Sequence, residues 1–301
     1  MMSTDETRVG VIGLGRMGLP ICRRLMRTGF AVAGHDTDDA AQASLAALGG
    51  QGIASRAELA ARSEVILTVL PGPEELGAML EPLLTEMRPG ATWIDMSTAT
   101  PALGRERARA GSERGVHVVE APMGGGPEQA RDGQLLIYAG GDAADLSRQR
   151  TLLDALAAHV LHVGSFGAGY TVKLLVNLLW FGQAVANSEA LVLAVRAGVD
   201  PETFRRTVQM SAAASRFMDS DATALMAGDN KAAFSLARSR DELTAVTEMA
   251  AELDVPLLLG DRVAEVYGQA LERYGDVLGE LLGARLAADR AGVDFDAPAP
   301  S

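Results

Sequence analysis

The feature that most constrains the fold is an apolar run that ends in a glycine-rich turn. Residues 8–13, RVGVIG, predict a buried strand, a helix follows to Gly29, and a second strand, residues 30–36, finishes with Asp36. Dinucleotides are bound by an arrangement of a strand, a G-x-G-x-x-G turn, a helix and a second strand, with an acidic residue about 20 positions after the turn. This chain has each of these parts in that order. The turn alone would also fit an ordinary tight bend, but its flanks favour a cofactor. Its residues are Gly13, Leu14, Gly15, Arg16, Met17 and Gly18.

Asp36 predicts which dinucleotide is bound. A carboxylate at the end of the second strand can accept both hydroxyls of an adenosine ribose, and it repels a 2′-phosphate. Thr37 and Asp38 follow, so no arginine is at hand to bind that phosphate. NAD is therefore the preferred cofactor, with NADP possible. Alternatively, Asp36 caps the helix that begins near Asp38.

The alternation of strands and helices continues to about residue 165. Further strands are expected at 64–71, 91–98, 117–122, 134–141 and 159–164, with a helix at 142–157. This order predicts an α/β fold with a Rossmann-type, doubly wound, mainly parallel sheet.

Three loops that follow strands carry candidate ligand contacts, because ligands bind beyond the carboxyl ends of such strands. The first loop, at Leu70 and Pro71, should lie over the cofactor. The second, at Ser97 and Thr98, contacts the ligands or caps the helix beginning near Pro101. The third, at 123–126, is glycine-rich and forms an anion-binding nest of backbone amides, or else is simply flexible. The candidates are Leu70, Pro71 and Thr98 for the cofactor, and Ser97, Thr98, Met123, Gly124 and Gly125 for the substrate.

Beyond the last strand, helical periodicity takes over, and residues 167–198 predict one long helix. It is apolar around most of its circumference, so we expect it to be buried. Lys173 and Asn177 share one stripe of it. A buried ammonium needs partners, although a lysine can also reach solvent along its aliphatic stem. A membrane span is not favoured, because these residues and Gln183 and Glu189 interrupt the apolar run.

The chain is therefore expected to form two domains, for which 301 residues suffice. Residues 1–165 form the dinucleotide-binding domain. Residues 166–296 form an all-helical domain for substrate binding and dimerisation, entered by the helix 169–197, and 297–301 is a disordered tail. One small domain cannot cover so apolar a helix, so we expect a homodimer or homotetramer.

Charge and composition exclude several classes of partner. The net charge of −12, with scattered basic residues, makes nucleic acid and anionic membranes poor partners. With a dinucleotide-binding motif in the chain, the expected partner is a small-molecule substrate. The single Cys22 permits no internal disulfide, which fits a reducing compartment. The first residues have no apolar signal core, so a cytoplasmic protein is expected. No zinc signature is present, so we expect no metal.

Four stretches, in order and spacing, resemble the β-hydroxyacid dehydrogenase family, which carries a helical domain like that of 6-phosphogluconate dehydrogenase. Within the family the chain is most similar to 3-hydroxyisobutyrate dehydrogenases and glyoxylate/succinic semialdehyde reductases. The resemblance implies that Lys173 is the catalytic acid/base, that Asn177 binds substrate and that the 120s loop holds the substrate carboxylate. It also implies that Arg240, where the family has lysine, lies near the nicotinamide. The stretches are residues 13–20, 95–98, 120–135 and 167–177.

The glycine loop departs from the family pattern, which begins with serine where this chain has Gly124. One hydrogen bond to the substrate carboxylate, about 1 kcal/mol or more, is thereby lost. Trp180 adds bulk one turn past Asn177 and either lines the pocket or belongs to the core. These features favour a larger or less acidic substrate than a small hydroxyacid.

The sequence thus predicts an NAD(P)-dependent oxidoreductase that transfers a hydride between nicotinamide and a β-hydroxyacid or its semialdehyde or ketone, with Lys173 as general acid/base. Two alternatives stay open. One is an imine reductase-type enzyme, against which Lys173 argues because such relatives typically lack it. The other is a non-catalytic, cofactor-binding protein, against which the Lys173–Asn177 pair argues.

Overall fold

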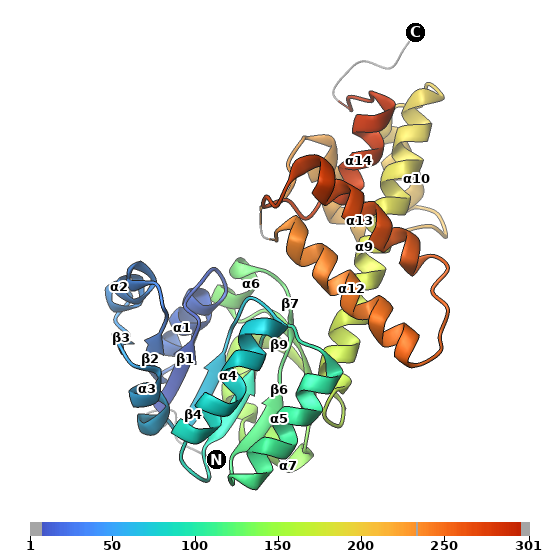
Figure 1. The fold of residues 1–301 in the computed structure, drawn as a ribbon. Coiled ribbons are helices and arrows are strands. Elements are labelled where there is room, and N and C mark those ends of the chain that lie inside the picture. Colours follow the sequence, from blue (N-terminus) through green and yellow to red (C-terminus); the bar gives the residue numbers. More distant parts are fainter. Residues whose placement is uncertain (1–7, 233, 296–301) are drawn as a thin grey trace. The chain divides into compact units, whose positions relative to one another are not determined.

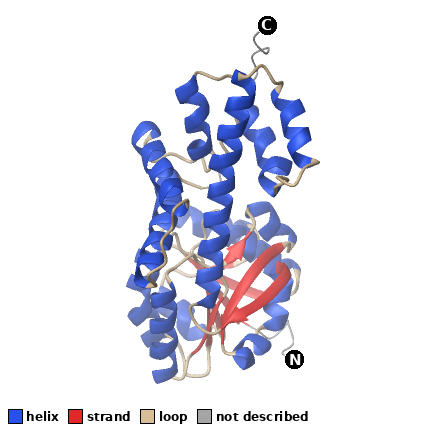
Figure 2. Cartoon of the chain, turned by 90° about the vertical axis from the view of Figure 1, so that its right-hand side faces the viewer, coloured by secondary structure: helices blue, strands red, loops and turns tan. Residues whose placement is uncertain are grey.

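The computed structural model describes residues 8–232 and 234–295, so the tail expected to be disordered lies outside the described residues. The chain divides into two compact units, one up to Lys173 and one from Leu174 onward. The division falls inside the long helix α9 (Ala168–Arg196). Figure 2 shows the strands gathered in the first unit and only helices in the second.

In the described residues of the first unit, nine strands form one sheet of order β3-β2-β1-β4-β5-β6-β8-β7, with β9 paired to β8. The neighbours from β3 to β6 are parallel, whereas β8 runs antiparallel to β6 and β7. The doubly wound, mainly parallel sheet is thereby confirmed; the short β3 and β7 were not predicted. The strands are β1 Arg8–Ile12, β2 Ala31–His35, β3 Gln51–Gly52, β4 Val65–Thr68, β5 Thr92–Asp95, β6 His117–Glu120, β7 Met123–Gly124, β8 Leu135–Gly141 and β9 Ala157–Gly164.

Helices cover both faces of this sheet (Figure 1). Because successive strand residues point to opposite faces, Val9 and Val11 join a core with α1, α6 and α8. Ile66 and Trp93 join a second core with α3, α4, α5 and Tyr170 at the start of α9. The helices are α1 Gly18–Arg27, α2 Asp39–Ala47, α3 Arg56–Arg62, α4 Pro73–Glu86, α5 Pro101–Glu113, α6 Pro127–Asp132, α7 Ala143–Arg148 and α8 Arg150–Leu156.

The prediction of a single helix at 142–157 is wrong, because the segment forms two helices, α7 and α8, that meet at Gln149. Gln149 leaves the helical backbone conformation, and its buried side chain donates a 2.9 Å hydrogen bond to Thr92 Oγ1. A buried polar anchor therefore decides the break, and no proline or glycine marks it in the sequence.

In the second unit, helices pack around two small cores. Non-helical connections separate α9 from α10 at 197–200 and α12 from α13 at 253–259, and α14 ends before Gly292. A π-helical turn, Phe217–Asp221, runs into the short helix α11. The helices after α9 are α10 Pro201–Gln209, α11 Ala222–Met226, α12 Leu236–Glu252, α13 Gly260–Tyr274 and α14 Leu282–Ala291.

The long helix α9 was expected to be buried, and for the single chain this is wrong. Leu179 and Leu193 are 65% and 71% exposed, whereas Phe181 and Leu191 are buried. The helices of one chain cover only part of a helix that is apolar on nearly every side. Among the described residues, α9 is the helix long and apolar enough to cross a membrane, but the core helix of a soluble protein meets the same criteria.

Candidate active site

The glycine-rich turn between β1 and α1 contains two packed glycines and one open one. A side chain at Gly13, which has a φ of +93°, would overlap the carbonyl oxygen of Val69, and one at Gly18 would overlap the carbonyl oxygen of Gly13. By contrast, no atom lies within 4 Å of the Cβ position at Gly15. The backbone therefore turns tightly and then faces open space at the start of α1, which suits a pyrophosphate.

Asp36 connects this turn to the end of β2. Its Oδ2 accepts a 2.6 Å hydrogen bond from the Leu14 amide, and its Oδ1 accepts one of 2.9 Å from the Asp38 amide. The side chain of Asp38, not that of Asp36, caps α2 by accepting from Ala40. The capping alternative for Asp36 is therefore wrong. Its carboxylate lies beside the turn, where the ribose of a dinucleotide would be held.

Polar residues end three neighbouring strands in register. Thr68 pairs with Asp95 across β4 and β5, and Asp95 pairs with Glu120 across β5 and β6. All three are fully buried. Thr68 Oγ1 donates a 2.6 Å hydrogen bond to Asp95 Oδ1. A buried polar row thus runs along the carboxyl edge of the sheet, where ligands of this fold bind.

Ser97 joins the loops that follow β4 and β5. Its Oγ accepts a 2.9 Å hydrogen bond from the Leu70 amide, and its own amide donates to Asp95. Pro71 next to Leu70 is exposed, and Thr98 is 9% exposed. Helix α5 is capped by Thr100, which accepts from the Leu103 amide, so the alternative that Ser97 or Thr98 caps it is wrong.

The first turn of α9 is anchored on the polar row by a buried ion pair. The carboxylate of Asp95 lies 3.0 Å from Arg107 Nη1, and both side chains are 0% exposed. The hydroxyl of Tyr170 donates to Asp95 and accepts from Arg107 Nη2. Burial lowers the pKa of Arg107, but the neighbouring Tyr170 and Asp95 raise it above its usual value, so the guanidinium is charged.

The Glu120 side chain holds the same turn of α9 by accepting from backbone amides. Its two oxygens accept from the amides of Gly167, at 2.6 Å, and Gly169, at 3.3 Å. Burial raises the pKa of Glu120, and these amides and Arg107 oppose the rise. Arg107, Glu120 and Tyr170 were not predicted from sequence. Isolated charged residues such as Arg107 and Glu120 are ordinarily expected on the surface, and a tyrosine in an apolar helix gives no sign of its hydrogen-bond partners.

This anchoring fixes the place of Lys173. It follows Gly169 by four residues, so it lies one turn, about 6 Å, further along α9. Its side chain is half-buried. The candidate acid/base thus stands one turn beyond the backbone amide that Glu120 holds at the strand ends.

The 120s loop is only partly the amide nest that three glycines suggest. Gly124 belongs to β7 and pairs with Leu136 of β8, and Met123 packs against the sheet core. The Gly126 amide donates a 2.9 Å hydrogen bond to Gln129 Oε1, so this amide is engaged within the chain. Gly125, with a φ of +108°, is exposed at the tip.

The remaining candidates lie beyond Lys173, in the helical unit. The amide nitrogen of Asn177 donates to Glu242 on α12, a partner that the sequence did not indicate. Trp180 donates to Asp221 at 3.0 Å and packs edge-on against aromatic rings of both helical cores, so it has a structural role in that unit. Arg240 is exposed and pairs with its neighbour Asp241.

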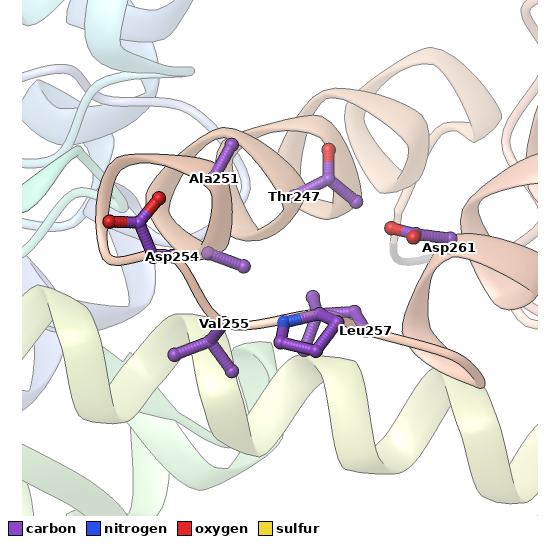
Figure 3. Close-up of a pocket in the computed structure, with 8 residues that line it drawn as sticks. Thr247, Ala251, Asp254, Val255, Leu257 and Asp261 are labelled. Atoms are coloured by element: carbon purple, nitrogen blue, oxygen red, sulfur yellow. The ribbon is translucent and has the colours of Figure 1, made fainter.

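A surface pocket of about 410 Å³ lies between α12 and α13 and contains none of the predicted site residues (Figure 3). The carboxylates of Asp254 and Asp261 lie at its two ends, and its lining includes no basic side chain. Such a lining repels a hydroxyacid. The pocket therefore does not compete with the strand ends as a substrate site.

Two family models and several named proteins match this chain. A family model described as the NAD binding domain of 6-phosphogluconate dehydrogenase matches residues 8–164. A second, described as NAD-binding of NADP-dependent 3-hydroxyisobutyrate dehydrogenase, matches residues 167–281. The 2-(hydroxymethyl)glutarate dehydrogenase of Eubacterium barkeri is 30% identical over 86% of this chain and 88% of its own length. The mitochondrial 3-hydroxyisobutyrate dehydrogenase of Mus musculus is 27% identical over 87% and 82%.

Solved structures show the same relationship. A 3-hydroxyisobutyrate dehydrogenase of Mycobacterium tuberculosis, solved with L-serine, superposes with a TM-score of 0.86 at 27% identity, over 93% of this chain and 99% of that one. An imine reductase from Myxococcus stipitatus has a TM-score of 0.65 at 18% identity, over 93% and 99%, and shares the fold alone.

The fold and the glycine-rich turn define a protein that binds a nicotinamide dinucleotide. More narrowly, the chain belongs to the β-hydroxyacid dehydrogenase family, as its four motifs predict.

Proposed function

We propose that this protein is an NAD-preferring dehydrogenase that interconverts a β-hydroxyacid and its semialdehyde or ketone, with Lys173 as the general acid/base. One observation carries the proposal. Glu120 and the Asp95–Tyr170 contact anchor α9 at the carboxyl edge of the dinucleotide-binding sheet, so Lys173 stands one turn above the strand ends where ligands of this fold bind. The names of the relatives, which include 3-hydroxyisobutyrate dehydrogenase, support the substrate class.

The choice of lysine at position 173 supports a proton-transfer role. The chain contains two lysines, Lys173 and Lys231, and its other basic residues are arginines. An arginine stays charged at any physiological pH, whereas an amine can give up and regain its proton. Lys231 is the other lysine and pairs with Asp221, so the use of lysine at position 173, among basic residues that are mostly arginine, supports acid–base chemistry there.

A nicotinamide dinucleotide would be held by the Gly13–Gly18 turn and Asp36, and when bound it would supply or accept the hydride. The chain's own residues divide the remaining work. In oxidation Lys173 removes the hydroxyl proton of the substrate, and in reduction it returns a proton to the oxygen. Asn177 orients the reacting oxygen. The Ser97 hydroxyl, which accepts from Leu70, keeps its proton free to donate to the ligand, and the 120s loop binds the carboxylate end.

A single substitution tests this role. Lys173→Ala should lower kcat by roughly 10²–10⁴-fold on β-hydroxyacids while the affinity for NADH, followed by fluorescence titration, stays near that of the wild type. Lys231→Ala is the matched control, since Lys231 pairs with Asp221. A Lys173→Ala enzyme with near wild-type kcat would remove Lys173 from the mechanism. The substrate panel should include cyclic imines, whose preferred turnover would instead support an imine reductase.

The preference for NAD rests on Asp36, whose carboxylate lies beside the glycine turn and repels a 2′-phosphate. Replacing Asp36 by Asn together with Thr37 by Arg should shift the ratio of kcat/KM values toward NADP. A wild-type enzyme that is faster with NADPH would contradict this assignment.

The exposed apolar side chains of the helical unit support a homodimer or homotetramer. Leu179 and Leu193 on α9 and Leu258 before α13 are 65%, 71% and 93% exposed. Covering such residues with a second copy would stabilise the assembly by about 25 cal/mol for each Å² of apolar surface. Light scattering at micromolar concentration should give at least twice the 31.4 kDa of one chain. Leu179→Gln should weaken the association of the subunits. A wild-type mass near that of one chain would refute the proposed homo-oligomer.

A further inference from the structure

We propose that the hydroxyl of Tyr138 binds the substrate at Gly124, where it donates a hydrogen bond to the carboxylate. This inference rests on the proposed function and names a residue that determines its specificity. Tyr138 lies on β8, and its Oη is 3.1 Å from the position that a Cβ at Gly124 would occupy. No side chain stands at position 124, so the phenol of Tyr138 occupies the space beside the loop.

The tyrosine faces the side of the sheet where α9 begins. Its neighbours in β8, Ile137 and Ala139, join the core on the opposite face of the sheet. Alternation along the strand therefore puts Tyr138 and Gly140 on the α9 face. Gly140 confirms this, because a Cβ there would meet Glu120 and the Gly169 amide. Tyr138 thus shares its face with the first turn of α9, from which Lys173 follows one turn later.

The hydroxyl of Tyr138 has no partner within the described part of the chain. The side chain is 5% exposed, and its Oη makes no hydrogen bond to another described residue. The other three tyrosines, all buried or half-buried, each use their hydroxyls: Tyr170 toward Asp95, Tyr267 toward Glu280 and Tyr274 toward Asp289. The Oη atom of Tyr138 is not fully buried, so it is in contact with solvent.

The chemistry of a phenol defines what it binds. Burial raises the pKa of Tyr138, so the group is a neutral donor at physiological pH. A neutral hydroxyl with no partner among the described residues forms its strongest hydrogen bond with a charged acceptor. The carboxylate of a hydroxyacid is such an acceptor. The glycine at 124 therefore does not by itself indicate a less acidic substrate, because Tyr138 brings a hydroxyl to the same place from the neighbouring strand.

Two substrates and four variants test the assignment. The substrates are 3-hydroxyisobutyrate and 2-methyl-1-propanol, which lacks the carboxylate. Tyr138→Phe should raise KM for the acid roughly tenfold, with little change in kcat and little change for the alcohol. Tyr274→Phe is the matched control, since it removes a hydroxyl that is bonded within the helical unit, and it should leave the ratio of the two substrates unchanged.

The third and fourth variants ask whether a hydroxyl at position 124 does the same work. In Tyr138→Phe, adding Gly124→Ser should restore part of the lost KM for the acid, whereas adding Gly124→Ala should not. An unchanged KM in Tyr138→Phe, in an enzyme that turns over hydroxyacids, overturns the role of Tyr138 and leaves the proposed function intact. Absence of hydroxyacid turnover in the wild type overturns both.

Discussion

Replacing Arg107 by methionine tests the buried anchor beneath α9 most directly. Arg107 is 0% exposed, and its Nη1 lies 3.0 Å from Asp95 Oδ2. Methionine keeps much of the apolar stem but removes the charged guanidinium, whose Cζ lies 5.0 Å from the centroid of the Trp93 ring. Asp95 and Glu120 then remain buried without a cation. Removing one partner of a buried pair costs about 3–5 kcal/mol.

Part of this cost is offset, because Arg107 is not fully satisfied in the native protein. Its Nε and Nη1 are buried and make no hydrogen bond, although Nη1 lies within ion-pair distance of Asp95. Losing these unsatisfied donors returns about 1 kcal/mol. We therefore expect Arg107→Met to lower the free energy of unfolding by about 2–4 kcal/mol. At about 2–4 °C per kcal/mol, the melting temperature of the first unit should fall by roughly 4–16 °C.

The pH dependence gives a second signature. Burial raises the pKa of Glu120 above its ordinary value of 4.5, so the folded state holds this proton more tightly than the unfolded state does. The protonated Glu120 carboxyl therefore contributes fully to the free energy of unfolding below pH 4.5. That contribution is lost as pH rises through the pKa of the folded state. Without Arg107 the pKa of Glu120 rises further. The loss of stability in the variant should thus grow as pH rises above 4.5 and shrink as pH falls toward that value.

The assay is urea unfolding followed by tryptophan fluorescence in a Trp180→Phe background, so that Trp93 alone reports the first unit. Arg114→Met is the control, because it breaks a partly exposed pair with Glu81, worth about 0–1 kcal/mol. Adding Asp95→Asn to Arg107→Met should recover part of the loss. A cost for Arg107→Met no larger than that of the control, or one independent of pH, would refute the reasoning.

Three further predictions follow from packing. Gly140→Ala should destabilise the first unit by about 1–3 kcal/mol in thermal unfolding, because its Cβ would overlap Glu120 Oε2; an unchanged melting temperature would contradict this. Burial raises the pKa of Cys22 to about 12, so the native thiol should resist thiol reagents at pH 8 and react only on unfolding, and rapid native labelling would count against it. Gly15→Ala should weaken NAD binding by roughly tenfold with little loss of stability, whereas Gly13→Ala should lose both; equal effects would be inconsistent with the turn described.

The sequence predicted the elements whose physical signal is local. The apolar runs, the glycine turn and the period of α9 depend on residues close together in the chain, and the structure confirms them within a few residues. The buried row of Thr68, Asp95 and Glu120 could not be predicted, because it depends on strand register. One charged residue at the end of an apolar strand gives no sign that another lies beside it.

The candidate site divides in the same way. Asp36 and Ser97 could be located because each follows a strand, but their partners, the amides of Leu14 and Leu70, come from loops distant in sequence. From the sequence, Gly124 indicates that the serine hydroxyl of the family motif is missing, because a linear motif shows only the residue at one position. The hydroxyl that faces it comes from Tyr138, on a strand that runs back past the loop.

The buried charges beneath α9 are better explained by position than by stability. Well-packed apolar residues in place of a buried ion pair are often as stable or more so, because desolvation offsets the attraction. What apolar residues lack is direction, and Asp95 and Glu120 supply it through hydrogen bonds to Tyr170, Gly167 and Gly169. Sliding α9 by one residue would move it about 1.5 Å and break these bonds together. A general acid must stand within about 0.5 Å of its productive place, so a helix that carries Lys173 needs such a register lock more than it needs extra stability.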